Sequence, residues 1–132
     1  MSADPVLAVS VLAARAACAD EALPLILRTA TDAFQADSGA IALLNPDSTK
    51  LEIEAGRGLP GGEIPALSLG QGIPGWAAFH AKPVLAADVA ADPRYRAIRP
   101  GVRCQMAAPL LAAEGQPVGV LSVESDRPRA FG

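Results

Sequence analysis

The segment from Leu69 to Leu110 constrains the fold of this chain more than any other part of the sequence. It contains, in order, a glycine-rich turn, a short helix, a brief strand, an arginine-rich loop and a buried strand. Pro74 suits the first turn of the helix, where its missing N–H costs little, and Pro83 ends the helix. Elements this short and this closely spaced predict a domain that mixes helices with strands.

A longer helix is expected before this segment. It is predicted to begin near Asp20 or Glu21, with the aspartate as its N-cap. After this start, apolar residues recur at helical spacing and define one buried face. The residues of that face are Leu23, Ile26, Leu27, Ala30 and Phe34.

Several apolar runs have the length and the bounding turns of strands. Ala40 to Leu44 is apolar throughout and predicts a strand buried on both faces, whereas Leu51 to Ala55 alternates with acidic residues and predicts one wet face. Val84 to Ala86 predicts a brief strand. Val102 to Ala112 and Pro117 to Glu124 predict two strands joined by a tight turn. This order of elements predicts an α+β domain, with an antiparallel sheet and helices packed against it.

Composition and charge exclude several classes of protein. The chain has 132 residues, enough for one domain, and its formal net charge of −3 argues against a nucleic-acid partner. Two cysteines, Cys18 and Cys104, cannot form a disulfide framework or a structural zinc site, so a cytoplasmic location is expected. The apolar run of residues 6–19 lacks a basic start and is too short to span a bilayer, so no membrane partner is expected.

Residues 5–18 predict a further helix that is apolar almost all round. Such a helix must be buried. We expect it to pack against a second copy of the chain in a homodimer, with docking on its own sheet as the alternative. Residues 1–19 are therefore interpreted as an N-terminal dimerisation element, and residues 20–132 as the main domain.

Five short motifs follow one another from Gly70 to Ser125: G-x-G-I-x-G-W-A, K-P-V, D-V-x-x-D-P-R-Y, V-R-C-x-M-A-x-P-L and G-x-P-V-G-V-L-S-V-E-S. In this order they resemble the GAF domains, a family of small sensory modules. The resemblance extends from the helix near residue 20 to Phe131. It implies a PAS-related fold with a central six-stranded antiparallel sheet and helices on one face. On the other face, the short helix and the loop after it would enclose a ligand pocket.

The resemblance also implies a role. In this family the pocket binds cyclic nucleotides, tetrapyrroles, haem, small anions or carboxylates, and an output kinase, cyclase, phosphodiesterase or transcription-activator unit lies beside it. A sensory or regulatory module of a bacterial signal-transduction protein is therefore expected, with a small ligand between the sheet and residues 73–106. A non-binding dimerisation and signal-relay domain is the alternative. The sequence stops before the family's usual C-terminal helix, so a fragment of a larger receptor is expected; no cofactor is identified.

Eight residues around the implied pocket are candidate ligand contacts. The aromatic ones serve either as pocket wall or as core anchors. The loop also places four arginines within a short stretch, either solvated or holding an anion through their guanidinium groups; they are Arg94, Arg96, Arg99 and Arg103. The sulfur-containing residues alternate along one strand face, as core or as pocket wall. The eight candidates are Trp76, Phe79, Asp88, Tyr95, Arg96, Arg103, Cys104 and Met106.

Catalysis is not expected. The family's free-methionine-sulfoxide reductases need nucleophilic and resolving cysteines in the loop before the buried strand, and Val89 to Arg103 contains none. The lone histidine, His80, is expected to be exposed near a helix end rather than to bind haem or a metal. Asp88 and Glu124 are expected to cap strand ends or face solvent. A helical turn is expected around Tyr95 to Ile98.

Overall fold

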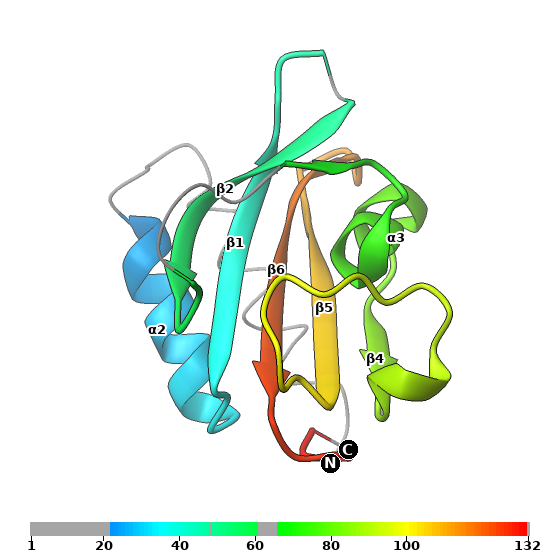
Figure 1. Cartoon of the computed structure of the whole chain (residues 1–132). Helices are drawn as coiled ribbons and strands as arrows, with labels where there is room; N and C mark the ends of the chain where they lie inside the picture. The colour runs from blue at the N-terminus through cyan, green and yellow to red at the C-terminus, as the bar shows by residue number, and fades with distance from the viewer. Residues whose placement is uncertain (1–21, 48, 61–65, 132) are drawn as a thin grey trace.

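A six-stranded antiparallel sheet forms the centre of the computed structural model, which describes residues 22–47, 49–60 and 66–131 (Figure 1). The strands lie in the order β3-β2-β1-β6-β5-β4, and each neighbouring pair is antiparallel. This is the α+β architecture that the sequence predicts. The strand bounds are Ser38–Leu44 (β1), Lys50–Arg57 (β2), Leu67–Ser68 (β3), Val84–Ala86 (β4), Cys104–Leu111 (β5) and Pro117–Ser125 (β6).

The two central strands are the first and the last of the described sheet. β1 pairs with β6 from Ser38 opposite Glu124 to Leu43 opposite Gly119. Glycine at position 119 permits this close approach, because a Cβ there would overlap the carbonyl oxygen of Ala42. β2 and β5 flank the central pair, and the short strands β3 and β4 form the edges, where their shortness limits the number of exposed backbone groups.

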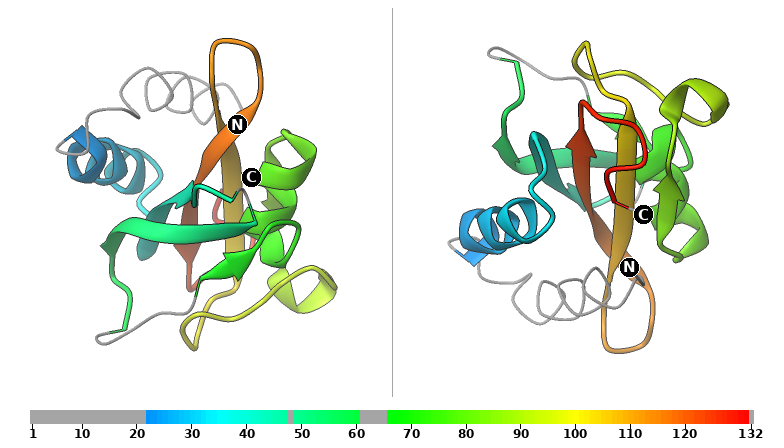
Figure 2. Two further views of the ribbon diagram at one scale, coloured as in Figure 1. Left: turned by 90° about the horizontal axis from the view of Figure 1, so that it is seen from above. Right: turned by 90° about the horizontal axis from the view of Figure 1, so that it is seen from below.

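The two α-helices of the described residues pack on opposite faces of the sheet (Figure 1 and Figure 2). α2 (Leu23–Ala33) lies against β1, β2 and β6, whereas α3 (Gly72–His80) lies against β5 and β6 on the other side. The 3₁₀ turn η2 (Val89–Ala91) follows β4 and contributes Val89 to the core under α3. We call these two surfaces of the sheet the α2 face and the α3 face.

Each face carries its own hydrophobic core, because successive residues of a strand point to opposite faces. On the α2 face, Leu23, Leu27 and Ala30 of the helix are buried against the strands. Their strand partners have mostly large apolar side chains, and they are Ile41, Cys104, Met106, Ala108, Leu110, Leu121 and Val123.

The core of the α3 face is built from smaller side chains. α3 contributes Ile73, Ala77 and Ala78, all fully buried. Gly75 lets this helix approach closely, since a Cβ there would lie 2.9 Å from the carbonyl oxygen of Ser68. The strand residues of this core are Ala42, Leu51, Val84, Ala86, Ala107 and Val120.

Most elements agree with the sequence prediction, and one detail is wrong. α2 covers the part of the predicted helix that the structure describes, from Leu23 to Ala33. The helical turn expected at Tyr95 to Ile98 lies instead at Val89–Ala91. The Asp88 carboxylate accepts a hydrogen bond from Ala90 N there, which satisfies a free donor at the start of the turn and favours it at that position.

Some predictions concern residues that lie outside the described part of the chain. These are the helix of residues 5–18, the dimerisation element of residues 1–19 and the start of the next helix at Asp20 or Glu21. Among the residues that the structure does describe, no helix is long and apolar enough to cross a membrane.

Candidate ligand-binding site

The loop between β4 and β5 covers the α3 face in front of β5 and β6 (Figure 1). Hydrogen bonds hold both of its ends. Near the start, the Asp92 carboxylate accepts from Arg94 N at 2.9 Å and from Arg94 Nη2 at 2.6 Å. Near the end, Arg103 N donates to Ser125 O at 2.8 Å, and Val89 N donates to Arg103 O at 2.9 Å. The loop is therefore anchored to itself and to β6.

Four polar side chains form one hydrogen-bonded chain between this loop and the sheet. Arg99 Nε donates to Ser38 Oγ at 2.8 Å, and Ser38 Oγ donates to Glu124 Oε1 at 2.6 Å. Gln105 Nε2 donates to Glu124 Oε2 at 3.2 Å. The four residues come from the loop, β1, β6 and β5, so the folded sheet is needed to bring them together. We call them the buried polar chain.

The buried polar chain lies on the α3 face. Its two members from β5 and β6, Gln105 and Glu124, are the strand neighbours of Cys104 and Val123, which point to the α2 face. Strand alternation therefore turns Gln105 and Glu124 to the opposite side. Both are nearly inaccessible to solvent, with exposed fractions of 1% for Gln105 and 3% for Glu124.

Charge at the buried polar chain is largely compensated. Arg99 Nη1 forms an ion pair with Asp126 Oδ1 at 2.7 Å, on the side where the aspartate reaches solvent. Burial raises the pKa of the Glu124 carboxyl, while the hydrogen bond from Ser38 and the charge of Arg99 oppose that rise. The pKa of Tyr95 is also raised, first by burial and then by the negative charge of Glu124.

Two atoms at the ends of the buried polar chain lack a partner. Arg99 Nη2, a donor, and Gln105 Oε1, an acceptor, are both buried and make no hydrogen bond to any described residue. Leaving a buried polar group unpaired costs about 1–3 kcal/mol, and more when the group is charged. A molecule that met both atoms would recover this free energy.

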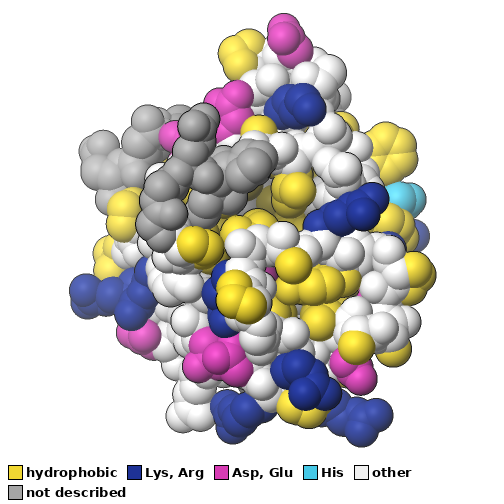
Figure 3. Space-filling view, in the orientation of Figure 1, with side chains coloured by type: hydrophobic (Ala, Val, Ile, Leu, Met, Phe, Trp, Pro, Cys, Tyr) yellow, Lys and Arg dark blue, Asp and Glu magenta, His cyan; other side chains and the backbone are white. Residues whose placement is uncertain are grey.

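Small and aromatic side chains surround these polar groups. Ala40 and Ala107 lie on either side of Ser122 in the strand register, all three on the α3 face. Trp76 of α3 and Tyr95 of the loop are partly buried and pack against the core of this face. In the space-filling view, hydrophobic side chains gather at the middle of this face and lysine or arginine side chains lie around them (Figure 3). Apolar walls with a few polar groups are typical of small-molecule sites.

The structure gathers some of the predicted site residues on the α3 face. Trp76 stacks on His80 with ring centroids 3.9 Å apart, and the Arg94 guanidinium lies 4.7 Å from the centre of the Trp76 ring. Tyr95 packs against the same core. Phe79 turns outward and is 60% exposed, so α3 contributes Trp76 rather than Phe79 to this side of the sheet.

Three predicted site residues, Asp88, Arg96 and Arg103, make no hydrogen bond to the side chains of the buried polar chain. Asp88 caps the 3₁₀ turn by accepting from Ala90 N at 3.1 Å. Arg96 and Arg103 are exposed, and Arg103 is held through its backbone. Among the described residues, Arg94 pairs with Asp92 and Arg99 pairs with Asp126.

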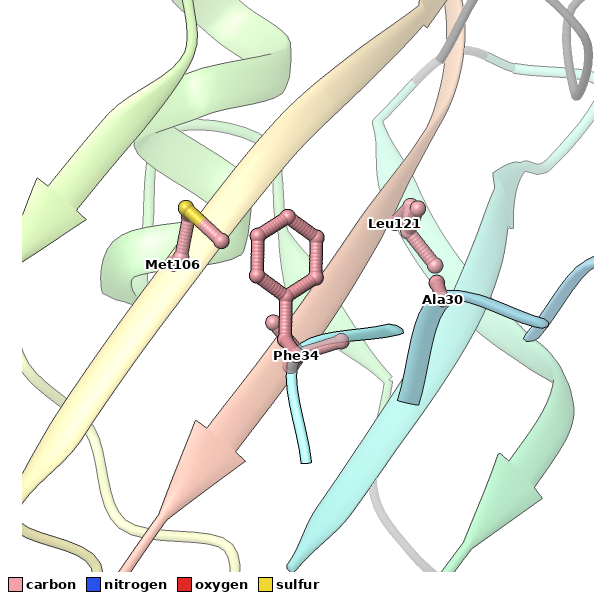
Figure 4. A pocket seen from close by; sticks show the side chains of 5 residues that line it. Ala30, Phe34, Met106 and Leu121 are labelled. Atoms are coloured by element: carbon pink, nitrogen blue, oxygen red, sulfur yellow. The ribbon is translucent and has the colours of Figure 1, made fainter. Parts of the chain in front are cut away.

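Cys104 and Met106 lie on the α2 face, separated from Trp76 and Tyr95 by the sheet. Cys104 is fully buried and is a free thiol. Met106 lines a small apolar cavity of about 10 Å³ between α2, β5 and β6 (Figure 4). That volume is about the space of one water molecule, and its walls offer no polar partner. Its lining consists of Ala30, Phe34, Met106, Leu121 and Val123.

The sequence reasoning missed three members of the buried polar chain: Ser38, Gln105 and Glu124. The expectation that Glu124 is exposed or caps a strand end is wrong, because the loop covers it. Strand alternation is the signal that would have found Gln105: once Cys104 and Met106 share one face, the residue between them must point to the other. Among the described residues, no group of three or more histidine, cysteine or acidic side chains could hold a metal ion.

Solved structures with a similar fold are GAF domains or proteins of related architecture. The free methionine-R-sulfoxide reductase of Neisseria meningitidis, in complex with its substrate, has a TM-score of 0.75 and 23% identity over 86% of this chain and 66% of that chain. The GAF domain of an Acinetobacter phosphoenolpyruvate-protein phosphotransferase has a TM-score of 0.74 and 21% identity, over 86% and 69%. A putative GAF sensor protein from Burkholderia vietnamiensis has a TM-score of 0.68 and 24% identity, over 83% and 65%.

At such identities these structures show a shared fold, and the chain spans about two thirds of their length. No curated protein matches the sequence. The family comparison is more direct, since the sequence matches the GAF domain family over residues 17–132. That match includes every described element, so the chain belongs to the GAF domain family.

Proposed function

We propose that this GAF domain is a sensory or regulatory module that binds a small molecule on the α3 face of its sheet. The observation that carries the proposal is the pair of unpartnered buried atoms, Arg99 Nη2 and Gln105 Oε1. Native proteins rarely leave such groups unsatisfied, and a functional site is one recognised reason for it. The residues Ala40, Ala107 and Ser122, which share this face of the strands, have small side chains.

The proposed contacts differ from the set expected from sequence. Trp76 and Tyr95 remain as walls of the site, because they lie on the same face as the buried polar chain. Ser38, Arg99, Gln105 and Glu124 are added as polar contacts. Cys104 and Met106 are left out, since the sheet lies between them and the site.

Binding is proposed to act on the loop that carries Tyr95 and Arg99. A ligand shifts a conformational equilibrium only through a difference in affinity between two states. A ligand that pairs Arg99 Nη2 in the closed arrangement of the loop would supply that difference. In a longer protein, the ordered loop would then signal to an output domain such as a kinase, a cyclase or a transcription activator, and a cytoplasmic homodimer is the expected assembly.

We propose a binding rather than a catalytic role, although one similar structure is a free methionine-R-sulfoxide reductase. Thiol chemistry needs an accessible, activated cysteine. Cys104, the cysteine within the described residues, is fully buried on the α2 face. Cys18 lies outside the described residues. Turnover of free methionine sulfoxide that disappears in a Cys104→Ser variant would overturn this part of the proposal.

A scaffold role is the second candidate, and one observation favours it. The polar atoms at the site are themselves buried, so in this arrangement the protein's own side chains cover them. A domain that only relays signals between protomers would need nothing more. Binding and scaffold roles therefore differ in whether the α3 face ever opens to a ligand.

Native mass spectrometry of the purified protein, followed by a thermal-shift panel of metabolites, separates the two roles. A sensory domain is expected to carry a co-purified small molecule or to gain thermal stability with at least one compound, because binding to the native state raises its stability. The gain should be lost in a Gln105→Leu variant and kept in Gln116→Leu, which alters an exposed glutamine in the β5–β6 turn. A bare mass together with no stabilisation by any compound would favour the scaffold.

A further inference from the structure

We infer that the α3-face site takes a small molecule with no net charge that presents one hydrogen-bond acceptor and one hydrogen-bond donor, as an amide or an amino-acid-like zwitterion does. The acceptor would pair with Arg99 Nη2 and the donor with Gln105 Oε1. This inference rests on the proposed function and narrows it. It differs from the anionic ligand that the four arginines of the loop suggest from sequence.

The charges already present at the site oppose an ionic ligand. The guanidinium of Arg99 is paired with Asp126 at 2.7 Å and reaches Glu124 through Ser38. An added anion would therefore meet the carboxylates of Glu124 and Asp126, and an added cation would meet Arg99. Removing an uncompensated charge from water is expensive, so a ligand without net charge fits this buried site best.

The orientation of the Gln105 amide fixes which partner the ligand must supply. Gln105 Nε2 faces Glu124 Oε2 at 3.2 Å, where a carboxylate requires a donor. Exchanging the oxygen and nitrogen of the amide would bring two acceptors together, which is unfavourable while Glu124 is ionised. The unpartnered atom is therefore the carbonyl oxygen, and it needs a donor from the ligand.

The proposed route to the site is the middle of the loop. Arg96, Ala97 and Ile98 make no hydrogen bond to any described residue, although the loop is anchored before them at Asp92 and after them at Arg103. No hydrogen bond to a described residue is made by these three residues themselves, whereas Arg99, which follows them, is tied to Ser38 and Asp126. Local opening of such a segment costs less than opening one tied by backbone hydrogen bonds, so a small molecule can enter here.

Four probes of nearly equal size test the inference by NMR on the ¹⁵N-labelled full chain, over a series of pH values because burial raises the pKa of Glu124. They are propionamide (neutral), alanine (zwitterion), propionate (anion) and propylammonium (cation). The side-chain amide signal of Gln105 and the Nε–H signal of Arg99 come from the same planar groups as the two unpartnered atoms, so each signal should shift when its neighbouring atom gains a partner. We expect propionamide or alanine to shift both signals, with the two ions binding at least about tenfold more weakly, a difference of about 1.4 kcal/mol. Which of the two net-neutral probes binds distinguishes an amide from an ammonium–carboxylate pair.

Matched variants show whether the shifts come from these two atoms. Gln105→Leu and Arg99→Gln should each weaken binding of the net-neutral probe. Gln116→Leu in the exposed turn and Arg28→Gln on the exposed side of α2 should leave it unchanged. Because the variants at 105 or 99 could also alter folding, the loss must appear in protein whose remaining amide spectrum matches the wild type.

Two results overturn the inference, and they differ in what they say about the proposed function. If propionate or propylammonium binds as tightly as a net-neutral probe, the charge argument is wrong while a ligand site on the α3 face stands. If no probe of any charge shifts the Gln105 and Arg99 signals, both the inference and the proposed site fail.

Discussion

The two faces of this sheet use the same strands for different purposes. On the α2 face, β5 and β6 present Met106, Leu121 and Val123 to a helix, and the cavity left among these apolar groups has room for about one water molecule. On the α3 face, the same strands present Gln105 and Glu124, which meet a loop through hydrogen bonds. One face is packed for stability, and the other leaves polar groups unsatisfied.

The comparison shows how closely a structural surface and a proposed binding surface can lie. Gln105 and Met106 are neighbours in the chain, yet one lies in a polar network and the other in an apolar core. A one-residue shift in the register of β5 would exchange them. Substitutions on the α2 face should therefore change stability strongly, and substitutions on the α3 face should change pH dependence and binding more than stability.

The largest loss of stability is expected from a substitution at Leu27, which is 1% exposed in the core of the α2 face. Leu27→Ala should lower the free energy of unfolding by about 2–5 kcal/mol, because it removes buried methyl groups and leaves a cavity. Leu25→Ala, the same change at a 62% exposed position of the same helix, should stay within about 0.5 kcal/mol of the wild type. Urea unfolding followed by circular dichroism measures both. Equal losses in the two variants would mean that α2 does not pack as described.

Adjacent alanines on β5 test the two faces with one chemical change. Ala108 and Ala107 are both 1% exposed, with Ala108 opposite Leu121 and Ala107 opposite Ser122. Ala108→Ser places a hydroxyl among apolar groups and should cost about 1–3 kcal/mol. Ala107→Ser should cost less, since its hydroxyl can meet that of Ser122 across the strands. The same urea experiment compares them, and a larger loss at 107 would reverse the assignment of the faces.

Glu124 should make stability depend on pH. Its pKa is raised in the folded state, chiefly by burial, so the native protein holds this proton to a higher pH than the unfolded chain does. Stability from this group is therefore full below its ordinary pKa of about 4.5 and is lost as the pH rises through the folded value. Glu124→Gln should flatten that decline, whereas Glu114→Gln in the exposed turn should preserve it. Urea midpoints from acid to neutral pH measure the slope; an unchanged slope in Glu124→Gln would remove Glu124 as its source.

The smallest loss of stability is expected from a substitution at Arg94, which lies at the rim of the α3 face. Its guanidinium lies 4.7 Å from the Trp76 ring centre and pairs with Asp92. Arg94→Gln should lose about 0.5–1 kcal/mol, the value of a cation–π contact at a partly exposed site. Trp76 is the chain's single tryptophan, so its emission should also change. Arg103→Gln, on the same loop but exposed, serves as the control, and identical emission from both variants would argue against the contact.

The sequence predicted the sheet well because its strands have strong local signals. The apolar run at Ala40 to Leu44 and the alternation at Leu51 to Ala55 correspond to β1 and β2, and Val84 to Ala86 is β4 as predicted. Glycine and proline marked the turns between them. The helical turn expected at Tyr95 to Ile98 was wrong, because the Asp88 carboxylate caps a turn at Val89–Ala91 instead.

The candidate site was only partly predictable, because its polar groups are brought together by tertiary pairing. Trp76 and Tyr95 stood out as aromatic residues near the implied pocket. Ser38 and Glu124 meet only through the pairing of β1 with β6, and no local pattern links them. Cys104 and Met106 were chosen from the sequence because their sulfur groups could contact a ligand. The alternation of the strand decides which face a side chain is on, and it puts Gln105 rather than these two residues on the α3 face.

The pairing of β1 with β6 also has a consequence for how the protein is made. Ser38 and Glu124 are 86 residues apart, so their hydrogen bond closes most of the chain into one loop. Such non-local contacts form late, because the entropy of closing the loop must be overcome first. During synthesis, β1 leaves the ribosome long before β6. The edge of β1 that pairs with β6 therefore stays unpaired until this last strand has been made. The central ladder and the buried polar chain are therefore completed in the same late step, so a nascent chain that lacks β6 has neither a sheet centre nor the buried polar chain.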